Sequence, residues 1–319
     1  MNREKYKDNI LVIILIIVAS ILILFSFFSP SIFTRPGNID FSDTGEIGNT
    51  IDGLMSPFIA IAGVILTFAA FYIQFKANQQ QIAQIKNQES KDRKLSIENK
   101  ILTMLSYHRE NVKDLEVINN GKIIKGQRVI EYFCLLIDQI KQALEPRLDR
   151  EPDSKFDEKD LTIASYLYFT FGNRVYNNDQ IKDKYSKYLN ESIVNVFPPI
   201  RNDDLTIFNG YDDVLSRYFR QLYQIIKYID QNTTLDYNEK YYYAKMVRST
   251  LSNNEQMLLF YNVLSPLGKA WIEEKLILKY KLIKNIPVYA IYGYKPTTWF
   301  IDEFKINKSE LNKYFEIYE

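Results

Sequence analysis

The strongest hydropathy pattern in the chain lies at its N-terminus, where two apolar segments follow each other closely. Ile10 to Phe28 contains no charged residue, and Leu54 to Phe75 is also uncharged, with Pro57 in its first turn. An apolar helix of about 20 residues is long enough to cross the hydrocarbon core of a bilayer. Proline is tolerated in a first turn, because the N–H that it lacks would have no helical partner there. The pattern predicts a transmembrane hairpin within residues 1–75, with spans at 10–28 and 54–75.

Charge around these two segments is distributed unevenly. Basic residues precede the first segment and follow the second, whereas the stretch between them has only Arg35 against four acidic residues. By the positive-inside rule, we expect both chain ends in the cytoplasm and a loop of roughly 25 residues outside. The first apolar run is longer than that of a signal peptide, and no small-x-small cleavage site follows it, so we expect the anchor to be retained.

The second apolar segment carries small side chains at helical spacing: Ser56, Ala60, Gly63, Thr67 and Ala70. Such a face allows membrane helices to approach closely. Two interpretations are open, since the face could pack against the first segment of the same chain or against a second copy in a homo-oligomer. The same spacing continues beyond the membrane in mostly glutamine positions up to residue 88. Because the apolar pattern of a strong coiled coil is absent there, residues 76–100 are predicted to form a helical stalk.

A period of 3.6 residues dominates the rest of the chain and predicts a helical cytoplasmic domain at residues 101–290. Apolar stripes of this kind include Ile130 to Leu144, which should end before Pro146, and Phe219 to Ile229. His108, the only histidine, lies within another stripe. It is either a general base or ligand, or a neutral core histidine that is hydrogen-bonded across a helix interface. Residues 291–319 form an aromatic-rich tail.

Composition excludes several classes of site. Lys and Arg number 40 against 39 Asp and Glu, giving a formal charge of +1, so nucleic acid is not indicated as a partner. One cysteine, Cys134, and one histidine cannot form a disulfide or a Cys/His zinc cage. The stretch GKIIKGQ has the glycine spacing of a phosphate loop, but Gln127 and Arg128 replace the required Lys and Ser/Thr. The sequence therefore predicts no metal, no cofactor and no recognisable catalytic motif.

The stretch RSTLSNNEQMLLFYNVLS at residues 248–265 predicts the start of a helix. Ser252 and Glu255 have the spacing of a capping box immediately before an apolar run. Arg248, on the preceding helix, is expected within reach of Glu255, as a pair that fixes the corner between the two helices. On the earlier helix, Arg220 lies at the edge of the apolar stripe and is either a solvated flank or a site for an anion or a partner.

Four stretches together resemble phage abortive infection proteins of the AbiC type: HRENV at 108–112, GQRVIEYF at 126–133, RYFRQLYQIIKYI at 217–229, and YAKMVRSTLSNNEQMLLFYNVLS at 243–265. The resemblance runs from the apolar hairpin to about residue 286. It implies a role in phage defence. Residue by residue, the family's histidine corresponds to His108, its aromatic-arginine helix to Tyr218, Phe219 and Arg220, and its Arg-x-x-Leu-Ser-x-x-Glu corner to Arg248, Leu251, Ser252 and Glu255. The candidate functional residues are His108, Asn111, Arg220, Arg248 and Glu255.

The resemblance and the anchor together suggest a mainly helical defence protein at the bacterial inner membrane. We expect membrane lipid and a second copy as partners, and a phage-derived protein as the trigger. Two alternatives remain: a membrane-tethered enzyme of the nuclease type, or a non-catalytic scaffold that presents its tail to a partner. HEPN-type ribonucleases use an Arg-x4-6-His motif. That motif is missing, because the nearest arginine upstream of His108 is Arg93.

Overall fold

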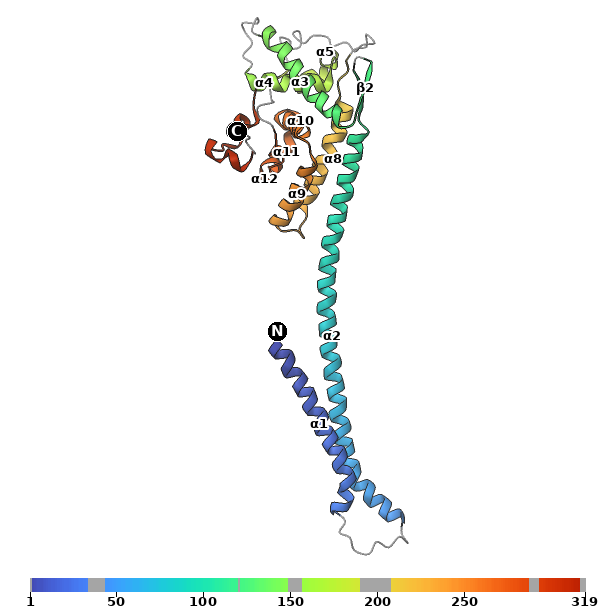
Figure 1. Cartoon of the computed structure of the whole chain (residues 1–319). Helices are drawn as coiled ribbons and strands as arrows, with labels where there is room; N and C mark the ends of the chain where they lie inside the picture. Colours follow the sequence, from blue (N-terminus) through green and yellow to red (C-terminus); the bar gives the residue numbers. More distant parts are fainter. Residues whose placement is uncertain are drawn as a thin grey trace. The chain divides into compact units, whose positions relative to one another are not determined.

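The computed structural model describes residues 2–33, 44–119, 121–148, 157–189, 208–286 and 293–315. These residues form a mainly helical chain (Figure 1), which confirms the predicted fold class. The chain divides into two compact units, Met1–Arg93 and Lys94–Glu319.

The first unit is built from α1 (Asn2–Phe33) and the first part of α2 (Thr44–Lys113). Both helices contain a stretch that is long and apolar enough to cross a membrane. Each extends past the predicted spans, so only residues 34–43 separate the two helices. Part of the predicted loop, residues 44–53, is helical and belongs to α2; where the membrane boundary lies along this helix stays a prediction.

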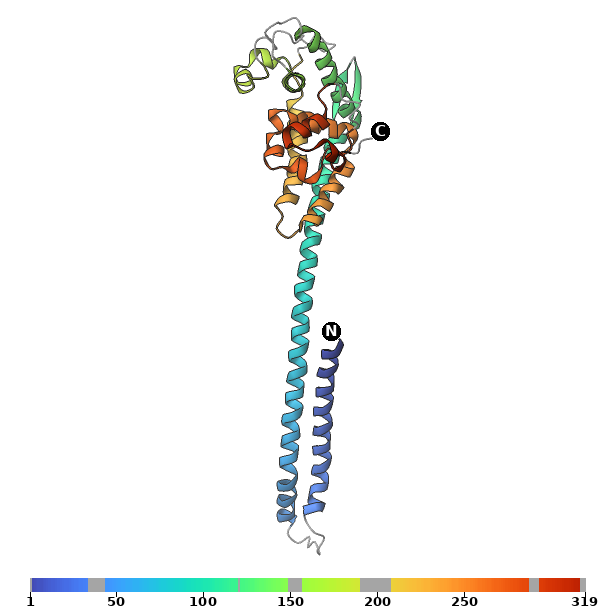
Figure 2. The ribbon, with the colours of Figure 1, turned by 90° about the vertical axis from the view of Figure 1, so that its left-hand side faces the viewer.

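Small side chains form the contact between α1 and α2, which run alongside each other in Figure 2. Ala19 and Ser26 on α1, and Ala62 and Ala69 on α2, are buried, and in each helix the two positions are seven residues apart. A seven-residue repeat keeps one seam of a helix facing its neighbour. At one end of this seam, the Ser29 hydroxyl donates a hydrogen bond to the Leu54 carbonyl oxygen at 3.3 Å.

The predicted small-residue face is not this seam. All five of its residues are exposed in the hairpin: Ser56, Ala60, Gly63, Thr67 and Ala70. At Gly63, a Cβ atom would meet no described heavy atom within 4 Å. The interpretation that this face packs against the first apolar segment therefore does not hold, and packing against a second copy stays a prediction.

The helical stalk is confirmed, because α2 continues without a break through the polar segment that follows the apolar stretch. Every side chain from residue 77 to residue 93 is exposed. Because even Ile82 and Ile85 are exposed here, this part of α2 gains little stability from packing against other described residues.

The second unit is organised around α10 (Asn253–Leu264), which is buried at every position from Glu255 to Leu264. Helices α3 (Gln127–Leu148) and α4 (Glu158–Phe171) pack against it, and α8 (Asp212–Gln231) pairs with α9 (Tyr237–Thr250). The shorter helical elements are α5 (Arg174–Asn177), α6 (Asp179–Lys184), η2 (Pro266–Gly268), α11 (Lys269–Glu273), α12 (Leu276–Tyr280), α13 (Pro296–Phe304) and η4 (Lys308–Lys313).

The apolar stripes predicted on α3 and α8 are buried as expected, namely Ile130, Phe133, Ile137, Ile140 and Leu144 on α3, and Phe219, Leu222, Ile226 and Ile229 on α8. The predicted end of α3 is wrong by a few residues, since the helix continues through Pro146 to Leu148. In the described part of the tail, Trp299 is buried and packs edge-on against Phe260, with 5.8 Å between ring centroids.

One β-hairpin interrupts the helices and was not predicted. Strands β1 (Glu116–Asn119) and β2 (Lys122–Lys125) pair antiparallel, with Val117 opposite Ile124. Gly121 in the turn has a φ of 67°, and Gly126 before α3 has a φ of 61°. Glycine adopts this left-handed region without the steric cost that a side chain would add. The hairpin thus turns the chain from the end of α2 into α3.

The single cysteine lies inside the second unit. Cys134 on α3 is buried, and its thiol donates a hydrogen bond to the Asn254 carbonyl oxygen at 3.4 Å. Burial raises the pKa of this thiol far above its ordinary value. Cys134 is therefore held as a neutral thiol at physiological pH.

Candidate functional site

The start of α10 forms the capping box that the sequence predicts. The Ser252 hydroxyl accepts a hydrogen bond from the Glu255 amide at 3.2 Å, and the Glu255 carboxylate accepts one from the Ser252 amide at 2.8 Å. Each side chain satisfies an amide that the first turn leaves without a partner. Local sequence alone therefore explains why a helix begins here.

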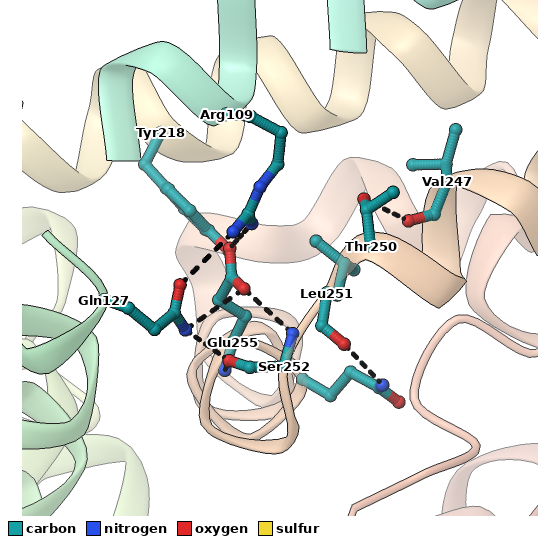
Figure 3. Close-up of polar contacts among 9 residues, drawn as sticks. Arg109, Gln127, Tyr218, Val247, Thr250, Leu251, Ser252 and Glu255 are labelled. Atoms are coloured by element: carbon teal, nitrogen blue, oxygen red, sulfur yellow. Dashed lines mark hydrogen bonds and ion pairs between the residues drawn. The ribbon is translucent and has the colours of Figure 1, made fainter. Parts of the chain in front are cut away.

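Glu255 has further partners that come from distant parts of the chain (Figure 3). Its fully buried carboxylate accepts hydrogen bonds from the Arg109 guanidinium at 2.7 Å, the Tyr218 hydroxyl at 3.2 Å and the Gln127 amide at 3.2 Å. Gln127 also donates to the Ser252 hydroxyl and accepts from Arg109 at 3.4 Å. The carboxylate therefore has a charged partner and a full set of hydrogen bonds, which a buried ion requires.

This network, the Glu255 cluster, joins four helices. Arg109 lies near the end of α2, Gln127 is the first residue of α3, Tyr218 belongs to α8, and Glu255 lies in the first turn of α10. Arg109 is 32% exposed, whereas the Glu255 side chain is 0% exposed. Removing one member of a buried ion pair is costly, because the other charge stays without compensation. The cluster therefore holds one specific arrangement of these four helices.

His108 lies beside the Glu255 cluster and packs against Tyr218, with 4.8 Å between ring centroids. The ring is fully buried, and neither nitrogen has a hydrogen-bond partner among the residues that the structure describes. Gln221 is near enough to favour the protonated ring, but it makes no hydrogen bond of normal length and angle with it. Burial lowers the pKa of His108 to about 4, against the opposing effect of Glu255. His108 is therefore neutral at pH 7.

Asn111 follows His108 by one turn of α2. Its side-chain amide donates a hydrogen bond to Gln221 on α8 at 2.8 Å. Asn111 and Tyr218 also border a cavity of about 280 Å³, whose lining includes the acidic residues Asp114, Glu116 and Asp213. His108 itself does not line this cavity.

Arg248 does not pair with Glu255, so that prediction is wrong. Its guanidinium donates hydrogen bonds to the Lys281 carbonyl oxygen at 2.9 Å and the Tyr280 carbonyl oxygen at 3.4 Å. These carbonyls lie where α12 ends, and a cation is stabilised there by the unpaired carbonyl oxygens. Arg109 is the arginine that pairs with Glu255, and Arg248 stabilises the C-terminal end of α12.

Arg220 lies outside the Glu255 cluster. It is exposed and lines a cavity of about 460 Å³, together with Tyr185 and Trp271. The structure thus brings His108 close to Glu255 and places Asn111 one turn further along α2, where it bonds to Gln221. It places Arg220 and Arg248 elsewhere. Sequence reasoning missed Arg109 and Gln127, because no spacing rule connects them to a carboxylate more than a hundred positions away.

Acid–base chemistry on a substrate requires a group that can reach it within hydrogen-bond distance. Glu255 and His108 are both fully buried, and Arg109 and Tyr218 already occupy one carboxylate oxygen. No group of three or more metal-binding side chains is present in the described part of the chain. The arrangement supports a structural role for the Glu255 cluster in joining helices.

Comparison with known proteins gives one family match within this unit. Residues 210–291 match a family model described as "Putative phage abortive infection protein". This confirms the AbiC-type resemblance. The AbiC-type region, residues 210–291, contains the described helices from α8 to α12. Arg220, Arg248 and Glu255 lie within it, whereas His108 and Asn111 lie outside it. Comparison with curated proteins and with solved structures gives no match.

Proposed function

We propose that this is a membrane-anchored abortive infection protein, whose helical cytoplasmic unit senses infection and acts at or through the membrane. One observation carries the proposal. The AbiC-type region is on the same chain as two helices that are long and apolar enough to cross a membrane. Abortive infection halts the infected cell, and an effector at the membrane could do this by changing its permeability.

Charge supports the orientation of the anchor. Basic residues flank the apolar hairpin on the side of both chain ends, and acidic residues predominate between the two helices. The positive-inside rule then directs the AbiC-type region into the cytoplasm of a bacterial cell, at the inner membrane. A phage-derived protein made in that compartment would be within reach as the trigger.

The exposed small-residue face of α2 supports a homo-oligomer. The α1–α2 seam uses Ala62 and Ala69, so Gly63 and its neighbours remain free for another helix. Small residues at such a face let backbones approach closely, which is where packing energy between membrane helices arises. The exposed stalk from residue 77 to residue 93 would gain cover from the same association.

The test is a phage challenge of bacteria that express the full chain, at low and high multiplicity, with survival and membrane potential recorded together. We expect protection of the culture at low multiplicity, and collapse with depolarisation at high multiplicity. Gly63→Leu should abolish protection and the cross-linked oligomer, because a larger side chain separates the helices. Ile61→Leu, at an exposed position that lies three or four residues from none of the five small residues, is the matched control and should leave both unchanged.

Three results would contradict the proposal. Protection with polarised membranes and degraded RNA or DNA would favour the tethered enzyme. Full protection by Gly63→Leu, with the oligomer intact, would remove the small-residue face from the mechanism. The scaffold would be favoured by two results together: the protein without residues 291–319 folds but no longer protects the culture, and the isolated tail captures a partner.

A further inference from the structure

The cavity beside Arg220 has the size of a small-molecule site. Its volume is about 460 Å³, within the range of about 300–1,000 Å³ that is typical of ligand pockets. Five helices contribute to its lining, namely α4, α6, α8, α10 and α11. Three of them, α8, α10 and α11, belong to the AbiC-type region. None of the residues of the Glu255 cluster lines it, so it is a separate feature of the same unit.

Aromatic rings form much of the cavity wall, and their neighbours hold them in place. Phe171 and Tyr185 stack on one side, with ring centroids 5.5 Å apart and an interplanar angle of 27°. On the other side, Tyr223 packs edge-on against Trp271 at 5.1 Å, and its hydroxyl donates a hydrogen bond to Glu274 at 2.6 Å. A planar ligand would meet rings that are already ordered, so binding would cost little side-chain entropy.

The charged side chains of the lining favour an anion. Arg220 and Lys184 are exposed, and neither makes an ion pair with a residue that the structure describes. The one acidic residue of the lining, Asp212, is already paired with Arg174, whose guanidinium donates to it at 3.1 Å. Arginine binds phosphate oxygens through a fork of N–H donors, and it does so more strongly than a neutral donor does.

The cavity also has a free acceptor. Asn262 is 5% exposed, and its side-chain amide donates a hydrogen bond to the Tyr166 hydroxyl at 3.2 Å. Its side-chain oxygen receives no hydrogen bond from the described residues. A ligand N–H group that enters the cavity could donate a hydrogen bond to this oxygen. The cavity thus combines aromatic walls, two cations and one acceptor.

We propose that this cavity binds a nucleoside phosphate. The base lies among the aromatic rings and donates an N–H group to Asn262, and the phosphate lies at Arg220 and Lys184. Stacking on aromatic side chains stabilises every base. The Lys184 ammonium already lies over the Tyr185 ring, 5.3 Å from its centroid, whereas Arg220 has no ion pair with a described residue. An apolar ligand would leave Arg220 in that state, and a bare phosphate would leave the aromatic rings without a contact. The role of this cavity as the sensing site of a defence protein rests on the proposed function. Nucleotide binding itself does not depend on infection and can be measured on the purified protein.

The test uses the purified full chain in detergent and isothermal titration calorimetry. The probes are the four ribonucleoside 5′-monophosphates, the four triphosphates and inorganic phosphate. We expect at least one nucleotide to bind, and Arg220→Glu to weaken it by about tenfold or more, because a charge-assisted hydrogen bond is replaced by repulsion. Arg217→Glu is the matched control, since Arg217 is exposed one turn earlier on α8 and does not line this cavity. It should bind as the unaltered protein does.

Three results would overturn the inference: no probe bound with Kd below about 1 mM, inorganic phosphate bound as tightly as the best nucleotide, or equal binding by Arg220→Glu. The phage challenge distinguishes this failure from that of the proposed function. Protection without nucleotide binding overturns only the nucleotide site. Nucleotide binding that depends on Arg220, in a chain that protects against no phage, supports the site and overturns the defence role.

Discussion

Replacing Arg109 by methionine tests whether the Glu255 cluster holds the four helices together. Among the described residues, Arg109 is the one cation paired with the fully buried Glu255 carboxylate, and the substitution removes it. Breaking a buried ion pair by removing one partner costs about 3–5 kcal/mol. Arg109 is 32% exposed, and water near it will screen the remaining charge, so we expect a loss of about 2–3 kcal/mol. For a unit of this size, that corresponds to a fall of about 4–12 °C in Tm.

Intrinsic fluorescence reports this change directly. Both tryptophans of the chain, Trp271 and Trp299, are buried in the second unit, at 3% and 1% exposure. Urea unfolding of the full chain in mild detergent, followed by tryptophan emission, therefore measures the helical unit and not the apolar hairpin. Arg128→Met is the matched control, because Arg128 is exposed and adjacent to the same cluster.

A double variant separates charge from packing. Glu255→Gln retains an oxygen that can accept from the Ser252 amide, and it removes the buried charge. The free energy of unfolding of the double variant Arg109→Met/Glu255→Gln should therefore lie within about 1 kcal/mol of that of the unaltered protein. If the double variant were as unstable as Arg109→Met alone, or if the single substitution cost less than about 1 kcal/mol, uncompensated charge would not be the cause.

Three further substitutions test other parts of the unit by the same fluorescence measurement. His108 has a folded-state pKa of about 4 against an ordinary value of 6.5, so only the unfolded ring takes up a proton as pH falls from 6.5 to 4. Stability should fall by about 1.4 kcal/mol per pH unit in that window, and His108→Leu should remove this slope; an unchanged slope would mean that another group titrates. Asp236→Ala removes the capping box of α9 and should cost about 1 kcal/mol, whereas an unchanged midpoint would show that the cap adds nothing. Lys94→Ala breaks the exposed pair with Glu239 and should leave the midpoint unchanged, and a clear loss would contradict the view that solvent screens this pair.

Local patterns allowed much of the fold to be predicted. The apolar stripes of α3 and α8, the two membrane-length helices and the Ser252–Glu255 capping box all depend on residues within one or two turns of each other. Spacing along a helix determines such features, so a single sequence contains them. The hairpin at β1 and β2 had a similar signal, because an Asn-Gly pair between short apolar runs is typical of a tight turn.

Long-range partners could not be read in this way. Arg248 was the expected partner of Glu255 because it is close in sequence, whereas Arg109 reaches the carboxylate from 146 residues away. Similarly, the small residues of α2 were visible, but which face packs against α1 depends on both helices. The pairing of Ala19 and Ser26 with Ala62 and Ala69 emerges only when the two are placed together.

The buried thiol of Cys134 makes the protein convenient for site-directed spectroscopy. Maleimides and nitroxide reagents attack thiolates at accessible positions, and the only native cysteine is 4% exposed, with burial raising its pKa. A cysteine introduced on the exposed face of α2, or near the Arg220 cavity, would therefore be the only position to react. Fluorophores or spin labels could then report helix association in lipid vesicles without first removing any native residue.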